Sequence, residues 1–244
     1  MSVPSATVPV GTALSQATAR LETAGCGSPR LDAEVLLAEV LGTDRAGLVL
    51  DPDRELSPAQ AAAFEAYVVR REGREPVAYL LGRKGFRHLE LQVDARVLIP
   101  RPETELLVEV GLELPQNTRV VEVGTGSGAV ALALKSERPD LRIVATDISA
   151  EALEVARANA DRLGLDVELV EADLLEGAGG PYDVVLANVP YVDPLDYAIL
   201  DPEIGQHEPE VAIVAGDAGA ATVRRLVAQL GETPLVALEV GLAQ

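Results

Sequence analysis

Cysteine, histidine and tryptophan are scarce in this 244-residue chain, which has one cysteine, two histidines and no tryptophan. The single thiol, Cys26, rules out a disulfide framework and a cysteine metal cluster. The two histidines, His88 and His207, lie far apart in the sequence, which argues against a zinc site. We therefore predict a protein without a metal centre.

Basic residues are also few, because 20 Lys and Arg stand against 39 Asp and Glu, for a formal net charge of −19. This balance argues against direct binding of nucleic acid and against an anionic membrane surface. No apolar run reaches membrane-spanning length, and no positive charge precedes the first apolar residues, as it would in a signal peptide. We expect a soluble, cytoplasmic protein that is a monomer.

One stretch departs from the acidic balance. Residues 70–101 carry eight Lys and Arg against four Asp and Glu, a local net charge of +4. Each of these side chains is expected on a solvated surface, and as a group they could form a docking face for an acidic partner.

Hydrophobic spacing divides the chain into three parts. Residues 1–82 have helical spacing and the capping box Ser57-Pro58-Ala59-Gln60, which predicts a small helical domain with a recognition role. Residues 83–100 change to a period of two, and Asp94-Ala95 between the strand-like runs 89–93 and 97–99 predicts a β-hairpin linker. Residues 101–244 alternate strands and helices, which predicts an α/β fold with a doubly wound, mostly parallel sheet.

The stretch from Arg119 to Ala129 predicts a nucleotide-binding turn. Its β-branched run suits a buried parallel strand, and Gly124, Gly126 and Gly128 follow at a spacing of two. Glycines at a strand end let backbone N–H groups approach a ligand closely. The pattern is G-x-G-x-G with Glu122 two residues before it, unlike the G-x-G-x-x-G of dinucleotide enzymes. A purely structural turn is the alternative.

An acid follows the next predicted strand, as a ribose-binding site requires. Leu141 to Ala145 reads as that strand, and Asp147 comes 19 residues after Gly128. In this fold an acid about 20 residues on binds the ribose hydroxyls of an adenosine cofactor. The alternative is that Asp147 caps the following helix, with Ser149 competing for that position.

The fourth predicted strand, residues 182–187, ends at Asn188-Val189-Pro190-Tyr191. Ligands of this fold bind at the carboxyl ends of the strands. A side-chain amide and a backbone carbonyl can accept hydrogen bonds from an NH₂ group, and a tyrosine offers a flat wall. This set suits a planar amide or aromatic amine whose nitrogen is the nucleophile. An ordinary turn with Tyr191 in the core is the alternative.

These motifs together resemble a known family of enzymes. The glycine turn and N-x-P-Y, with the runs PRLDAEVLLAEVLG (29–42), EPVAYLLG (75–82), VLIPRPETE (97–105) and HEPEVAI (207–213), are similar to the peptide chain release factor glutamine methyltransferases. The resemblance implies a Rossmann-like class I methyltransferase domain, joined by a β-hairpin to an N-terminal helical bundle. It also implies S-adenosyl-L-methionine as cofactor and the glutamine of a Gly-Gly-Gln motif in a release factor as substrate.

The resemblance also assigns roles to residues. Asp147 would hold the ribose, Asp173 would lie near the adenine, and Asn188 with the carbonyl of residue 189 would accept from the substrate NH₂. Glu103, Thr104 and Glu208 are further candidates for the pocket wall. The full set is Glu122, Gly124, Thr125, Gly126, Gly128, Asp147, Asp173 and Asn188 for the cofactor and Asn188, Val189, Pro190 and Tyr191 for the substrate, with Asn188, Pro190 and Tyr191 catalytic.

Two departures from the family pattern lead to expectations. Val189 replaces the usual proline of N-P-P-Y, which could loosen the pocket or change the substrate. The sequence stops at Gln244, soon after the fifth predicted strand, residues 234–239, whereas the family continues through a helix and a final strand pair. Without those strands, an exposed sheet edge is expected.

Three other functions are compatible with the motifs. A relative could methylate a glutamine of a ribosomal protein. An N6-adenine nucleic-acid methyltransferase shares N-P-P-Y, but the acidic composition argues against it. A non-catalytic module that binds S-adenosylmethionine is the third alternative.

Overall fold

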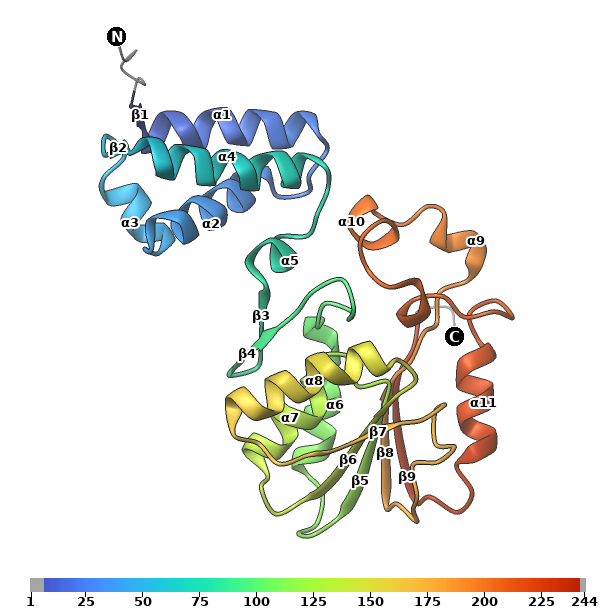
Figure 1. Ribbon diagram of the computed structural model, residues 1–244. Coiled ribbons are helices and arrows are strands. Elements are labelled where there is room, and N and C mark those ends of the chain that lie inside the picture. Colours follow the sequence, from blue (N-terminus) through green and yellow to red (C-terminus); the bar gives the residue numbers. More distant parts are fainter. Residues whose placement is uncertain (1–6, 242–244) are drawn as a thin grey trace. The chain divides into compact units, whose positions relative to one another are not determined.

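The computed structural model describes residues 7–241, and residues 1–6 and 242–244 lie outside this range (Figure 1). The chain divides into two compact units, Met1–Leu81 and Gly82–Gln244. No helix of the described residues has the length and apolar character needed to cross a membrane.

The first unit is a helical bundle with a two-stranded sheet. Buried leucines such as Leu21, Leu36 and Leu37 and the ring of Phe64 form one apolar core. Its elements are β1 (Val8–Pro9), α1 (Val10–Thr23), α2 (Pro29–Leu41), α3 (Arg45–Leu50), β2 (Glu55–Leu56), α4 (Pro58–Glu72) and α5 (Val77–Leu81).

Side-chain caps start helices α3 and α4 of this unit. The predicted capping box is confirmed: Gln60 N–H donates to the Ser57 hydroxyl over 3.3 Å, and Ser57 N–H donates to the Gln60 side chain over 3.0 Å. Both bonds satisfy N–H groups that the first turn of α4 leaves without a partner.

Asp32 on α2 pairs with Arg71 on α4 at 2.8 Å, and both side chains are buried. The pair links the two helices inside the bundle.

The second unit begins with the predicted β-hairpin, but the turn lies elsewhere. Strands β3 (Arg83–Phe86) and β4 (Leu89–Gln92) pair antiparallel, so the turn falls at residues 87–88 and not at 94–95. The expectation of a strand over residues 97–99 is wrong, because the N–H of Ile99 donates to the Glu208 carboxylate and not to another strand. Val97 and Ile99 are nevertheless buried, so the apolar run there reflects burial and not strand pairing.

The core of the second unit is a five-stranded parallel sheet in the order β7-β6-β5-β8-β9. This confirms the predicted doubly wound sheet, whose first two crossovers are α7 (Ala129–Glu137) and α8 (Ala150–Leu163). The strands are β5 (Arg119–Val123), β6 (Arg142–Asp147), β7 (Glu168–Glu171), β8 (Val184–Asn188) and β9 (Leu235–Glu239).

Helices cover the two faces of this sheet. Helices α6 (Glu105–Leu112), α7 and α8 lie on one face, and α11 (Ala221–Gln229) lies on the other (Figure 1). Alternate residues of β5 show the division. Val120 belongs to the apolar cluster that includes residues of α6, α7 and α8, whereas Val121 belongs to the cluster that includes Leu226 of α11. Short helices η1 (Pro102–Thr104), α9 (Pro194–Tyr197), α10 (Pro202–Gly205) and η2 (Glu210–Ala212) occupy the connections.

The basic stretch at residues 70–101 does not form a free cationic face. Most of its charged side chains are paired with a carboxylate inside their own unit, which neutralises them locally. The pairs are Arg70–Glu75, Arg71–Asp32, Arg83–Glu90, Arg87–Glu137, Arg96–Asp94 and Arg101–Glu208. The structure therefore gives no support to the docking face for an acidic partner.

Candidate active site

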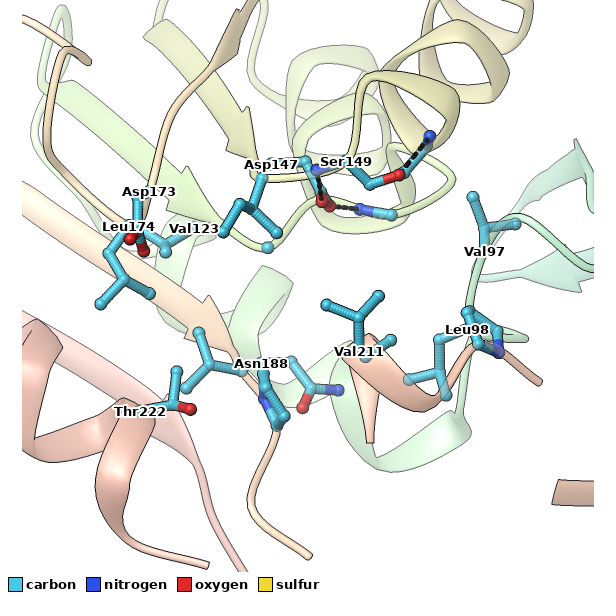
Figure 2. A pocket seen from close by; sticks show the side chains of 18 of the residues that line it. Val97, Leu98, Val123, Asp147, Ser149, Asp173, Leu174, Asn188, Val211 and Thr222 are labelled. Carbon is cyan, nitrogen blue, oxygen red and sulfur yellow. Dashed lines mark hydrogen bonds between the residues drawn. The ribbon is translucent and has the colours of Figure 1, made fainter. Parts of the chain in front are cut away.

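A cavity of about 240 Å³ opens at the carboxyl ends of β5, β6 and β8 (Figure 2). Val123, Asp147 and Asn188 mark the three strand ends, and side chains of the later loops close the opposite wall. This is the location that a doubly wound sheet gives to its ligands, because the strand order reverses there.

The glycine turn after β5 forms one wall of the cavity. The N–H groups of Gly124 and Thr125 both donate to the carbonyl of Thr146 over 2.9 Å, which ties the turn to the end of β6. Gly124 has a φ of +75°, and a Cβ there would lie 3.3 Å from the carbonyl oxygen of Asn188. Glycine at this position lets the ends of β5 and β8 approach each other closely.

Glu122 holds this turn from beneath and does not line the cavity. Its carboxylate accepts from the Thr125 hydroxyl over 2.6 Å and from the Ala131 N–H over 2.9 Å. Burial raises the pKa of Glu122 from 4.5 to about 7, because the low dielectric disfavours the charged form. The contacts of both Glu122 and Thr125 thus give them a role in the shape of the turn.

Asp147 faces the glycine turn from the end of β6. Its two oxygens accept from the N–H groups of Gly126, over 2.8 Å, and Ser149, over 3.0 Å (Figure 2). The cap of α8 is Ser149, whose hydroxyl accepts from Ala152 N–H, so the capping alternative for Asp147 is wrong. Burial raises the pKa of the Asp147 carboxyl. Asp173 also lines the cavity and pairs with Arg225 at 2.6 Å.

Asn188 at the end of β8 begins a chain of hydrogen bonds. Its Nδ2 donates to Thr104 Oγ1 over 3.1 Å, and the Thr104 hydroxyl donates to Glu239 over 2.7 Å. The Tyr191 hydroxyl donates to the other oxygen of Glu239 over 3.4 Å. Burial and the adjacent Glu239 carboxylate raise the pKa of Tyr191. The side chain of Val189 is buried, with 2% exposed.

Glu208 joins two segments that line the cavity. Its buried carboxylate accepts from the N–H of Ile99 over 3.0 Å and pairs with Arg101. Val97 and Leu98, just before Ile99, and Val211, just after Glu208, line the cavity. Glu208 therefore holds the wall together and does not line it.

The structure gathers seven of the predicted site residues around the cavity. These are Gly124, Gly126, Asp147, Asp173, Asn188, Val189 and Pro190. The predicted residues Glu122, Thr125, Gly128 and Tyr191 do not line it, and neither do the candidates for the pocket wall, Glu103, Thr104 and Glu208. Gly128 has a structural constraint, since its φ is +84° and a Cβ would lie 2.8 Å from Leu132.

Sequence reasoning missed the apolar wall and one carboxylate. Val97, Leu98, Ile148, Leu174 and Val211 supply the apolar surface. Ile148 and Leu174 each follow a predicted acid after a strand, which was a usable signal. Glu239 ends the fifth predicted strand, at the edge where ligands bind, but it belongs to no motif.

These walls fit an adenosine cofactor. A flat apolar base matches an apolar wall, and a ribose diol matches a carboxylate such as Asp147 beside a turn where glycine leaves room. The cavity ends at a side-chain amide, Asn188, which can orient a polar substrate. Within residues 7–241, no group of His, Cys, Asp and Glu is arranged to hold a metal ion.

Comparison with known proteins agrees with this chemistry. Residues 102–202 match the family described as the methyltransferase small domain, and residues 12–82 match the PrmC N-terminal domain. The fold and these matches define an S-adenosylmethionine-dependent methyltransferase.

Curated relatives identify the family. The release factor glutamine methyltransferase of Deinococcus radiodurans is 44% identical over 220 residues, which cover 88% of this chain and 78% of that protein. The one of Mycolicibacterium smegmatis is 44% identical over 226 residues, which cover 89% and 78%. The one of Rhodospirillum rubrum is 38% identical over 243 residues, which cover 96% and 75%. The chain belongs to the release factor glutamine methyltransferase family.

Asp147 provides a first test of the site. Asp147→Asn keeps the size of the side chain but directs an NH₂ group at a backbone N–H donor, either that of Gly126 or that of Ser149. We expect the Kd for S-adenosylmethionine to rise by about 10- to 100-fold in isothermal titration. Asp166→Asn, at an exposed position outside the cavity, is the matched control. An unchanged Kd in folded Asp147→Asn would remove Asp147 from the cofactor site.

Proposed function

We propose that this chain transfers the methyl group of S-adenosylmethionine to the side-chain amide nitrogen of the glutamine in the Gly-Gly-Gln motif of a peptide chain release factor. The observation that carries the proposal is the position of Asn188, whose amide lines the same cavity as the glycine turn and Asp147. The names of the curated relatives, all release factor glutamine methyltransferases, support the substrate.

The cofactor and the chain have different tasks in this reaction. S-adenosylmethionine supplies a methyl group on a sulfonium, which is a strong electrophile. An amide nitrogen is a weak nucleophile because its lone pair is delocalised into the carbonyl group. The chain must therefore hold the nitrogen in line with the carbon–sulfur bond, and such orientation can contribute roughly 7–11 kcal/mol.

The strand ends supply the acceptors for this orientation. The side-chain oxygen of Asn188 and the backbone carbonyl of Val189 accept from the substrate NH₂, which favours a nitrogen whose lone pair faces the methyl group. With the cofactor bound, the substrate nitrogen held by these acceptors would form its bond to the methyl carbon as the carbon–sulfur bond breaks, with the electron pair left on sulfur. The methylated nitrogen would then lose a proton to solvent. No covalent enzyme intermediate is needed, because the methyl group passes directly to the nitrogen.

The helical domain has a different part in the proposal. Residues 1–82 carry no catalytic motif, and residues 12–82 match the PrmC N-terminal domain family. We assign recognition of the release factor to residues 1–82, and the methyl transfer to residues 101–244.

Mass spectrometry tests the proposal directly. Purified release factor is incubated with this protein and S-adenosylmethionine, and a gain of one methyl group is expected on the glutamine of Gly-Gly-Gln. A release factor with alanine in place of that glutamine is the matched control and should gain none. Methylation of a ribosomal protein alone would overturn the release factor as substrate. Cofactor binding without transfer to any protein would favour a non-catalytic module.

A further inference from the structure

Two side chains from distant parts of the sequence, Thr104 and Glu239, meet behind Asn188. Glu239 ends β9 and is the register partner of Asn188 at the end of β8, so the two side chains begin from adjacent strand ends. Thr104 belongs to η1, before α6, and is buried with 6% exposed. The hydrogen bonds Asn188–Thr104 and Thr104–Glu239 span 84 and 135 residues of sequence. Figure 2 shows the Asn188 side chain at the cavity wall.

Donor counting determines which way the Asn188 amide faces. A carboxylate can only accept hydrogen bonds, so the single hydroxyl proton of Thr104 is donated to Glu239, over 2.7 Å. The Thr104 oxygen is then an acceptor toward Asn188, and the atom 3.1 Å away must be the NH₂ nitrogen. The amide oxygen of Asn188 is therefore left for a ligand. Tyr191 reinforces the arrangement, because its hydroxyl donates to the second oxygen of Glu239.

We propose that Thr104 and Glu239 are positioning residues that hold the Asn188 amide with its oxygen available to the substrate NH₂. The inference rests on the proposed function, in which that NH₂ belongs to a glutamine. An Asn188 amide turned by 180° would present its own NH₂ to the substrate NH₂, and two donors cannot bond to each other. The Glu239 carboxylate prevents this turn through the Thr104 hydroxyl.

Variants of Thr104 and Glu239 test by kinetics the hydrogen bonds that link Glu239, Thr104 and Asn188. Thr104→Val keeps the shape of the side chain but removes the hydroxyl, and we expect kcat for release factor methylation to fall about 10- to 100-fold. Thr104→Ser restores the hydroxyl and should recover most of kcat. Glu239→Gln can donate to Thr104, which allows the hydroxyl to turn toward Asn188, and a similar fall is expected. The Kd for S-adenosylmethionine should stay unchanged in all three folded variants.

A wild-type kcat in Thr104→Val and in Glu239→Gln would overturn the proposal. Equal losses in Thr104→Ser and Thr104→Val would also overturn it, because the effect would then not come from the hydroxyl.

A second readout does not depend on the substrate. In NMR spectra of the full chain, the side-chain NH₂ signal of Asn188 is assigned by its loss in Asn188→Ala. We expect a nuclear Overhauser effect between these protons and the side chain of Thr104, weakened in Glu239→Gln. Its absence in the wild type would overturn the orientation. Its presence in a protein that methylates no release factor would support the orientation and contradict the proposed function.

Discussion

Replacing Asn188 with alanine is expected to lower kcat for release factor methylation by about 100- to 1,000-fold, the effect of removing one group that stabilises a transition state. The side chain lines the cavity at the end of β8 and is the amide that would orient the substrate nitrogen. Alanine removes the acceptor and also leaves the Thr104 hydroxyl oxygen without its donor. Methyl transfer is followed by mass spectrometry of the release factor under saturating cofactor.

A control separates chemistry from folding in this experiment. Leu195 on α9 follows the N-x-P-Y segment closely, is 83% exposed and does not line the cavity. Leu195→Ala should therefore leave kcat within about twofold of the wild type, since surface substitutions have small effects. The affinity of Asn188→Ala for S-adenosylmethionine should change less than about tenfold. If Asn188→Ala keeps a wild-type kcat, the amide has no part in the reaction.

Glu122 is expected to make stability depend on pH in an unusual direction. Its pKa is about 7 in the folded protein, against an ordinary value of 4.5. Between these values the folded state binds more protons than the unfolded state, so the free energy of unfolding falls as the pH rises. The contribution is fully present below pH 4.5 and is lost as the pH rises through 7. The shift corresponds to about 3 kcal/mol in total.

Comparison with Glu122→Gln isolates this contribution. The glutamine has nearly the same shape as Glu122 but does not titrate. The free energy of unfolding of the wild type should therefore fall by about 3 kcal/mol relative to that of the variant between pH 4.5 and 8. Other carboxyl groups, such as Glu137, whose pKa is lowered by its pairing with an arginine, are present in both proteins. Their contributions to the pH dependence of unfolding therefore cancel in the difference between the two curves. Urea unfolding at several pH values, followed by circular dichroism, gives the two curves. Parallel curves would show that Glu122 ionises normally.

A matched variant tests whether burial is the cause. Glu168 on β7 is exposed and lies outside the glycine turn. Glu168→Gln should follow the wild-type curve over the same range. A curve for Glu168→Gln that resembles that of Glu122→Gln would assign the effect to overall charge and not to the buried carboxyl.

The sheet was predictable because its signals are local. The β-branched run of β5 and the glycines after it predict a buried strand and a turn with positive φ. Asp147 and Asn188 are predictable because they follow strands, and parallel strands bring their carboxyl ends to one edge. The hairpin shows the limit of such reasoning. The alternation of apolar residues continues to Ile99, but only Leu89–Gln92 forms a strand of it.

Local sequence signals are enough to predict the class of fold, the glycine turn and the positions of Asp147 and Asn188 at strand ends. Which of these residues line the cavity, and which side chains lie behind them, follows from contacts between distant parts of the chain. Glu122 has the motif spacing of a ligand contact, yet it lies beneath the turn and accepts from Ala131 N–H. Glu239 belongs to no motif, yet β8–β9 register places it beside Asn188. The physical reason is that periodicity encodes contacts within one element, whereas these contacts depend on the pairing of strands that lie far apart in the chain.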